Sequence, residues 1–193
     1  MQLLRGPVRK SNVGDESEGV AALQRGDIRG LAVLVRLHQL KALRAAFGIL
    51  GNRFEAEDAV ADSFIKVVEK IGTYEQARPF EPWFYRIVVN TAIDRGRMAR
   101  RETPFAEVLT DEMGTADFDV RLQVAAAVRA LSAEERAVVV LRYYLDFDER
   151  SIAKILQTPM GTTKSRLHRA RERLRRELSE PNQCWALSAA EGV

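Results

Sequence analysis

Residues 148–178 read DERSIAKILQTPMGTTKSRLHRARERLRREL, and the spacing of the apolar residues in this stretch decides the fold class. In its second half, side chains recur at intervals of three and four, which is typical of one buried face of an α-helix. These side chains are Thr163, Leu167, Ala170, Leu174 and Leu178. A shorter helix is predicted at about 148–156, and QTPMG at 157–161 separates the two helices. A helix, a short turn and a second helix make the helix–turn–helix pattern.

The second of these helices is strongly basic. Seven Lys and Arg side chains lie between residues 164 and 176, against the single acid Glu172. A recognition helix inserts its N-terminal half into the major groove, where Lys and Arg bind guanine edges and flanking arginines bind phosphates. An arginine-rich helix that is merely solvated, with its acids paired to neighbouring arginines, is the alternative. We expect DNA contacts from Lys164, Ser165, Arg166, His168, Arg169 and Arg171.

The rest of the chain also shows helical spacing of its apolar residues. Further helices are predicted within 19–51, with a break near Gly26–Asp27, and at about 55–71, 82–101, 120–131 and 133–145. Ser132-Ala-Glu-Glu135 is a capping box, which opens the last of these. Since no segment shows sustained strand alternation, the chain is predicted to be all-α.

An acidic stretch divides the predicted helices into two groups. Residues 102–119 contain six Asp or Glu and no Lys or Arg, together with Pro104 and Gly114. This composition is typical of a flexible linker between domains. The predicted organisation is a flexible arm at 1–18, a helical domain at 19–101, the linker at 102–119, a helix–turn–helix domain at 120–178 and a tail at 179–193.

Composition excludes several classes of protein. The 193 residues are 46% hydrophobic with a formal charge of +3, and the single cysteine, Cys184, cannot form an internal disulfide. The N-terminus lacks the apolar core of a signal peptide, and the longest aliphatic run, 137–141, is too short to cross a bilayer. We therefore expect a cytoplasmic protein without membrane insertion. With no P-loop, nucleophile motif or Cys/His cluster, we expect no enzymatic activity, small-molecule substrate, metal or cofactor.

A second basic region ends the helix predicted at 82–101. Aromatic, amide and arginine side chains accompany it, and such groups stack on and recognise single-stranded bases. The candidates for this contact are Tyr74, Arg78, Arg86, Asn90, Arg95 and Arg97. The alternatives are that aromatics such as Trp83 belong to the core and that the terminal arginines only complement the helix dipole.

Four stretches together resemble the extracytoplasmic-function (group IV) sigma factors of the sigma-70 family, the small promoter-recognition subunits of bacterial RNA polymerase. They are Gly26-Asp27, FEAEDAVADSF at 54–64, WFYRIVVNTAID at 83–94 with its arginine tail, and residues 131–171. The resemblance covers roughly residues 19–178 and implies two helical domains, sigma domain 2 and sigma domain 4.

The resemblance also implies partners and roles. Domain 2 of such factors binds the clamp helices of the largest polymerase subunit and melts the −10 element, while domain 4 binds the β flap and recognises the −35 element. By position, Asp58, Asp62 and Lys66 belong to the clamp-binding surface, the loop at 72–80 captures a flipped −10 base, and Asn90 helps to recognise that element. The family also implies an anti-sigma factor that holds the protein inactive.

Three positions depart from the family pattern. Ala61 stands where a Gln often precedes the acid of the docking helix, Gln157 replaces a Gly in the helix–turn–helix, and the aromatics usual around Leu37-His38 are missing. A left-handed Gln costs about 1 kcal/mol more than Gly. Two other functions fit the sequence: a dimeric helix–turn–helix regulator that binds a palindrome unaided, and a sigma-like protein that titrates an anti-sigma factor.

Overall fold

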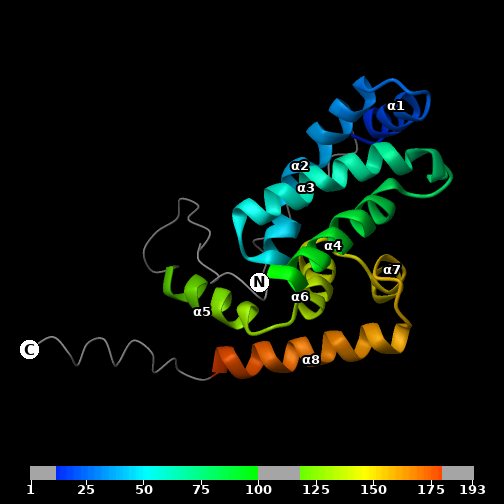
Figure 1. Ribbon diagram of the computed structural model, residues 1–193. Coiled ribbons are helices and arrows are strands. Elements are labelled where there is room, and N and C mark those ends of the chain that lie inside the picture. The colour runs from blue at the N-terminus through cyan, green and yellow to red at the C-terminus, as the bar shows by residue number, and fades with distance from the viewer. Residues whose placement is uncertain (1–11, 100–117, 180–193) are drawn as a thin grey trace, which may run out of the picture.

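The computed structural model describes residues 12–99 and 118–179, and every regular element in these ranges is a helix (Figure 1). The predicted all-α class is therefore confirmed. The N-terminal domain consists of α1 (Asn12–Gln24), α2 (Arg29–Leu50), α3 (Arg53–Lys70), the 3₁₀ turn η1 (Ile71–Thr73) and α4 (Phe80–Ala99). The C-terminal domain consists of α5 (Phe118–Arg129), α6 (Ala133–Val139), the π-helical turn η3 (Val140–Tyr144), α7 (Glu149–Ile155) and α8 (Met160–Ser179).

The turn between α2 and α3 shows how local sequence sets the helix boundaries. Gly51 ends α2 at φ +71°, and its N–H donates to the Phe47 carbonyl over 2.7 Å. Glycine adopts this left-handed conformation without steric cost. Asn52 then caps α3 by accepting a hydrogen bond from the Glu55 N–H. The two helices are thus joined by a short turn and lie side by side.

The core of the N-terminal domain is rich in alanine. Ala42, Ala45 and Ala46 of α2 and Ala56 and Ala59 of α3 are fully buried. Small side chains at a helix interface allow the two helix axes to approach closely. Larger residues, among them Phe64, Phe84 and Val88, fill the remaining space between α2, α3 and α4.

The C-terminal domain begins its second helix with the predicted capping box. The Ser132 hydroxyl accepts from the Glu135 N–H, and the Glu135 carboxylate accepts from the Ser132 N–H over 2.9 Å. The helix predicted at 133–145 continues to Tyr144, but its second half is π-helical and not α-helical. There the Leu145 N–H bonds to the Val140 carbonyl, five residues back, which produces a π turn.

The two domains share one hydrophobic core. Helices α6, η3 and α7 contact α2 and α4, so that α6 and α7 lie between α4 and α8 (Figure 1). Buried residues of both domains, including Ile49, Tyr85, Ala137 and Val140, belong to the same apolar cluster. The arrangement leaves the far side of α8 directed away from the N-terminal domain.

Two boundaries differ from the prediction. Helix α1 begins at Asn12, so residues 12–18 are helical where the sequence predicted a flexible arm. The buried Val20 and Leu23 hold this helix against the core, and a Glu16 carboxylate oxygen lies 2.8 Å from His38 Nε2. Residues 118 and 119, assigned to the acidic linker, start α5. The rest of that linker, and all of the predicted tail after Ser179, lie outside the described residues.

Candidate nucleic-acid interface

Helix α8 packs by the face that its apolar spacing predicted. Thr163, Leu167 and Ala170 are buried there, whereas Leu178 at the end of the helix is exposed. The turn before α8 contains Gln157 at φ +51°, the left-handed conformation expected at this position. The hydroxyls of Thr158 and Thr163 lie 3.0 Å apart and join the turn to the helix. The helix–turn–helix is therefore confirmed, with one face of α8 free for a partner.

The free face of α8 carries Lys164, Ser165, His168 and Arg171, all of which are exposed. Arg171 is held by Tyr143, a residue of η3 that sequence reasoning did not select. Its Nε donates to the Tyr143 hydroxyl over 2.7 Å, and its guanidinium carbon lies 5.8 Å from the centre of the tyrosine ring. Contact with an aromatic face and a hydrogen bond together restrict a long side chain, so Tyr143 orients Arg171.

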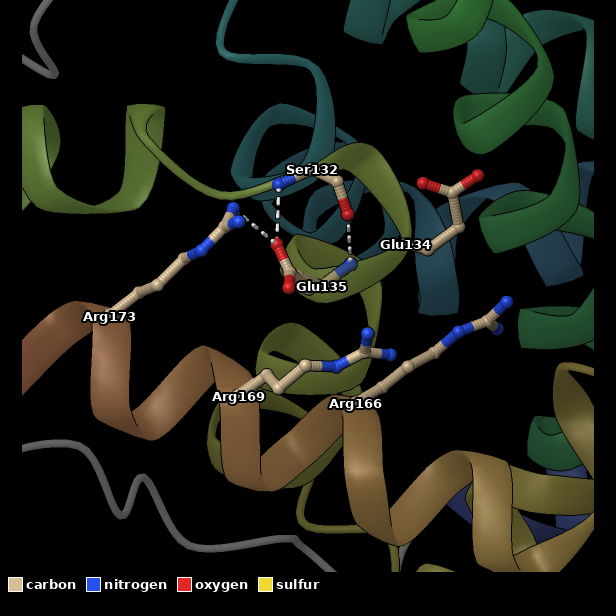
Figure 2. A pocket seen from close by; sticks show the side chains of 6 residues that line it. All are labelled: Ser132, Glu134, Glu135, Arg166, Arg169 and Arg173. Atoms are coloured by element: carbon tan, nitrogen blue, oxygen red, sulfur yellow. Dashed lines mark hydrogen bonds and ion pairs between the residues drawn. The ribbon is translucent and has the colours of Figure 1, made fainter.

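Three other arginines lie on a separate flank of α8. Arg166, Arg169 and Arg173 face the N-terminal end of α6 and line a cavity of about 470 Å³ with Ser132, Glu134 and Glu135 (Figure 2). The six residues predicted to contact the −35 element are therefore divided between two faces. Arg173, which was not among the predicted contacts, donates to Glu135 over 3.1 Å.

The electrostatics of this cavity centre on Glu134. Partial burial by itself raises the pKa of the Glu134 carboxyl, but hydrogen bonds from its own backbone and from Arg97 outweigh burial and leave the pKa below its ordinary value. Arg166 lowers it further through its charge. Glu134 is therefore an anion placed between arginines of both domains.

Tyr74 does not stand in the single-strand site that the sequence predicted for it. The residue is buried, its ring packs against Phe80 and Trp83, and its hydroxyl donates to the Arg78 carbonyl. Burial raises the pKa of the Tyr74 phenol, with a smaller contribution from the charge of Glu16. Tyr74 therefore shapes the loop at 72–80, and its ring is not free to stack on a base. Trp83, only half buried, is also packed against the core.

Helix α1 holds the loop at 72–80 in place through hydrogen bonds. Gln24 of α1 donates to the carbonyls of Ile71 and Tyr74 over 3.1 and 2.9 Å, and accepts from the Gln76 side chain over 2.7 Å. Three predicted −10 contacts remain accessible, one in this loop and two on α4. They are Arg78, which pairs with Glu75, the exposed Arg86, and the half-buried Asn90.

Arg95 joins two of the predicted sites. It was predicted to contact DNA, but its guanidinium lies 2.7 Å from Asp62, 3.1 Å from Glu55 and 3.6 Å from Asp58. The hydrogen bond with Asp62 makes the largest contribution to raising the pKa of Arg95. Asp58 and Asp62, assigned to polymerase binding, thus surround this arginine on the α3–α4 surface.

Lys66 and Arg97 point to different neighbours. Lys66 donates to the Thr91 hydroxyl over 2.9 Å, which ties α3 to α4. Arg97, predicted to contact DNA, forms an ion pair with Glu134 of the other domain over 2.7 Å.

Among the described residues no cluster of His, Cys, Asp or Glu could hold a metal ion. No helix within 12–99 or 118–179 is long and apolar enough to cross a membrane.

Two segments of the chain match known protein families. Residues 34–102 match the family described as Sigma-70 region 2, and residues 121–174 match the one described as Sigma-70, region 4. The chain is also 35% identical over 157 residues to the ECF RNA polymerase sigma factor SigL of Mycobacterium tuberculosis, which covers 74% of this chain and 85% of SigL. The chain belongs to the ECF group of sigma-70 factors. This sigma factor directs RNA polymerase to promoters, and its family acts in transcription initiation.

Other relatives extend over most of this sigma factor. SigW of Bacillus subtilis is 29% identical over 178 residues, covering 83% of this chain and 95% of SigW. Among solved structures, RpoE of Bartonella quintana in complex with the anti-sigma factor NepR has a TM-score of 0.61 at 25% identity, covering 77% and 96% of the two chains. CnrH in complex with the cytosolic domain of CnrY shares the fold, with a TM-score of 0.65 at 22% identity and coverage of 86% and 97%.

Proposed function

We propose that this sigma factor recognises the −35 element with the free face of α8. The observation that carries this proposal is the exposure of Lys164, His168 and Arg171 on one side of α8, away from the packed residues Thr163, Leu167 and Ala170. Each bidentate contact between such a side chain and a base edge contributes about 1–3 kcal/mol of discrimination. We assign phosphate contacts to Arg166 and Arg169, on the flank of α8.

The −10 element is assigned to the surface around the loop at 72–80. Arg86 and Asn90 of α4 supply an exposed cation and a half-buried amide, and Arg78 of the loop supplies a second cation. Separating a base pair costs about 1.4 kcal/mol of stacking per step, and trapping one base returns about 1–3 kcal/mol. This surface can therefore start the melting of promoter DNA, but polymerase must stabilise the full bubble.

Polymerase binding is assigned to α3. Asp58 and Asp62 present carboxylates on an exposed helix face, and Arg95 between them limits the net negative charge. From the family resemblance, we assign the clamp helices of the largest polymerase subunit as the partner of this face, and Lys66 lies at the edge of the face. The β flap is assigned as the partner of the C-terminal domain. The exposed Ile65, one turn after Ala61, adds an apolar contact to the same face.

Regulation by an anti-sigma factor follows from the relatives. The solved RpoE structure contains the anti-sigma factor NepR, and we assign a protein of this class to the present chain. We also place the protein in the cytoplasm, where polymerase acts, and give it no catalytic role. The two proposed domains retain the predicted limits, except that the N-terminal one starts with α1 at Asn12 and the C-terminal one with α5 at Phe118.

The decisive experiment is transcription in vitro with core polymerase and a cognate promoter. We expect Lys164→Ala with His168→Ala to reduce initiation on a promoter that carries the −35 element, and to leave polymerase binding in a pull-down unchanged. Arg176→Ala, an exposed arginine at the far end of α8, is the matched control. Two results would contradict the proposal. One is initiation at the promoter that does not need the sigma factor bound to polymerase, and the other is a double variant whose activity equals that of the Arg176→Ala control.

A further inference from the structure

The C-terminal end of α1 has a fixed position against α2. Gly26 stands at φ +85° just after the helix, and the N–H of Asp27 donates back to the Ala22 carbonyl over 3.0 Å. A left-handed glycine followed by this hydrogen bond is a common way for a helix to end. A Cβ atom at Gly30 of α2 would overlap the carbonyl oxygen of Gly19 in α1, so the two helix backbones are in direct contact. The last turn of α1 is therefore a rigid support for its side chains.

Gln24, the last residue of α1, makes three side-chain hydrogen bonds to the loop at 72–80 and the turn before it. Its Nε2 donates to the carbonyls of Ile71 and Tyr74 over 3.1 and 2.9 Å, and its Oε1 accepts from Nε2 of Gln76 over 2.7 Å. A side-chain amide has two N–H donors at one end and an acceptor oxygen at the other. Because backbone carbonyls only accept, the nitrogen of Gln24 must face Ile71 and Tyr74. Its oxygen must then face Gln76.

The orientation of Gln24 determines that of Gln76. Gln76 can approach the Gln24 oxygen only with its own NH₂ group, since a carbonyl oxygen offers no proton to donate. The Gln76 side chain is otherwise exposed, and its Oε1 accepts no hydrogen bond from the described residues. An unrestrained glutamine can rotate its amide by half a turn and meet either a donor or an acceptor. Held by Gln24, Gln76 instead offers its oxygen as a free acceptor at the surface of the loop.

A free acceptor distinguishes two kinds of base. Adenine and cytosine carry an exocyclic amino group, which donates, where guanine and thymine carry a carbonyl oxygen, which accepts. The Gln76 oxygen can bond to the amino group, whereas the carbonyl of guanine or thymine would face it with a second acceptor. A side chain that is already ordered also loses less conformational freedom when a base binds.

We propose that Gln24 is a positioning residue for recognition of the −10 element. By fixing the amide of Gln76, it makes the loop favour adenine or cytosine over guanine or thymine at one position of that element. The proposal rests on the function proposed above, which assigns the −10 element to the surface around the loop at 72–80. Gln24 uses both ends of its amide within the protein, so it acts through Gln76 and needs no contact with DNA of its own.

Binding of the polymerase holoenzyme to promoter DNA that is unpaired over the −10 element tests this role. Each of the four bases is placed in turn at every position of the element, and the ratio of affinities for amino and carbonyl bases is measured. Gln24→Met keeps the length of the side chain and removes its three hydrogen bonds, and Gln76→Ala removes the side chain proposed to meet the base. Gln39→Met is the matched control, because Gln39 is an exposed glutamine of α2 whose side chain makes no hydrogen bond within the described residues. Urea unfolding of each free variant measures its stability.

The expected result is a change in selectivity at one position. The wild type and Gln39→Met should prefer amino bases there by at least about five-fold, and Gln24→Met and Gln76→Ala should each abolish most of this preference. Gln24→Met should cause no further loss of selectivity in a chain that already carries Gln76→Ala. A Gln24→Met variant that loses stability, or binds all four bases more weakly, with an unchanged ratio would show a purely structural role and overturn the proposal. A preference for guanine or thymine that depends on Gln76 would overturn it as well.

A further variant separates this inference from the proposed function. Asn90→Ala tests the assignment of the −10 element to this surface without involving Gln24. If Asn90→Ala weakens recognition of the element while Gln24→Met and Gln76→Ala leave the ratio unchanged, the positioning role is wrong and the proposed function stands. If none of these variants alters binding to any −10 sequence, the assignment of the element to this surface is wrong, and the positioning role is rejected with it.

Discussion

Arg95 of α4 and Asp62 of α3 form an ion pair in which Nη2 lies 2.7 Å from Oδ2. The sequence assigned these residues to different partners, Arg95 to DNA and Asp62 to polymerase. In the folded protein each is the other's nearest charged neighbour, with Glu55 and Asp58 completing the group. A change at either residue therefore alters the charge presented by the other.

The Asp62–Arg95 pair predicts coupling between two assays. Asp62→Ala should weaken polymerase binding in a pull-down, while unfolding should become easier by only about 0.2–1 kcal/mol, as is usual for exposed ion pairs. Arg95→Ala should partly compensate in the double variant, because it removes the cation whose charge Asp62 no longer balances. A double-mutant cycle on polymerase affinity measures this coupling, and strictly additive effects would show that Asp62 acts without Arg95.

Tyr74 is predicted to act on the loop and not on a base. Tyr74→Phe keeps the packed ring and removes only the hydrogen bond to the Arg78 carbonyl, so we expect a loss of about 1 kcal/mol in the free energy of unfolding. Promoter melting, followed by the reactivity of unpaired thymines, should change little. A large melting defect in a variant of unchanged stability would mean that the hydroxyl contacts DNA.

Tyr143 is predicted to set the position of Arg171. Tyr143→Phe removes the 2.7 Å hydrogen bond but keeps the ring, whereas Tyr143→Ala removes both contacts. Discrimination between the cognate −35 element and a scrambled one should fall in the order wild type, Phe, Ala, by up to about ten-fold for Ala. Competition binding of the polymerase holoenzyme to the two promoters measures this ratio. Equal losses on both promoters would point to a structural defect.

Gln157 is predicted to be a site at which stability can be gained. At φ +51° a glycine is unstrained, so Gln157→Gly should raise the free energy of unfolding by up to about 1 kcal/mol. The glutamine side chain is exposed, so no packed contact is lost. Urea unfolding tests the change, with Gln157→Ala as the control that keeps the strain. A glycine variant no more stable than the alanine variant would contradict the argument.

The lowered pKa of Glu134 predicts that acid loosens the contact between the domains. A carboxyl whose pKa is lower in the folded state contributes stability above its ordinary value near 4.5, and that stability is lost as the pH falls through the lowered pKa. Urea unfolding across the acid range measures this loss, and Glu134→Gln should remove the part of the pH dependence that Glu134 contributes. An identical acid response in the variant and the wild type would assign the loss to other carboxyls.

Local sequence was sufficient for the helices and for the packed face of α8. The three- and four-residue spacing of Thr163, Leu167 and Ala170, the Ser132–Glu135 capping box and the left-handed Gln157 each depend on neighbours within a few residues. The same local reasoning missed the π turn after Val139 and started α1 too late, at Gly19 and not Asn12. Helix α1 has few apolar residues before Val20, and its first turns gain the Glu16–His38 contact only in the folded chain.

The amino-acid sequence by itself determined that this is an all-helical protein of two domains with a basic recognition helix, because helix periodicity and charge are properties of short segments. Only the tertiary structure decided which charges are free. It buried Tyr74, paired Arg95 with Asp62, and placed Glu134 against Arg97 of the other domain. Such partners lie tens of residues apart along the chain, and an ion pair forms only where packing brings both side chains to the same surface.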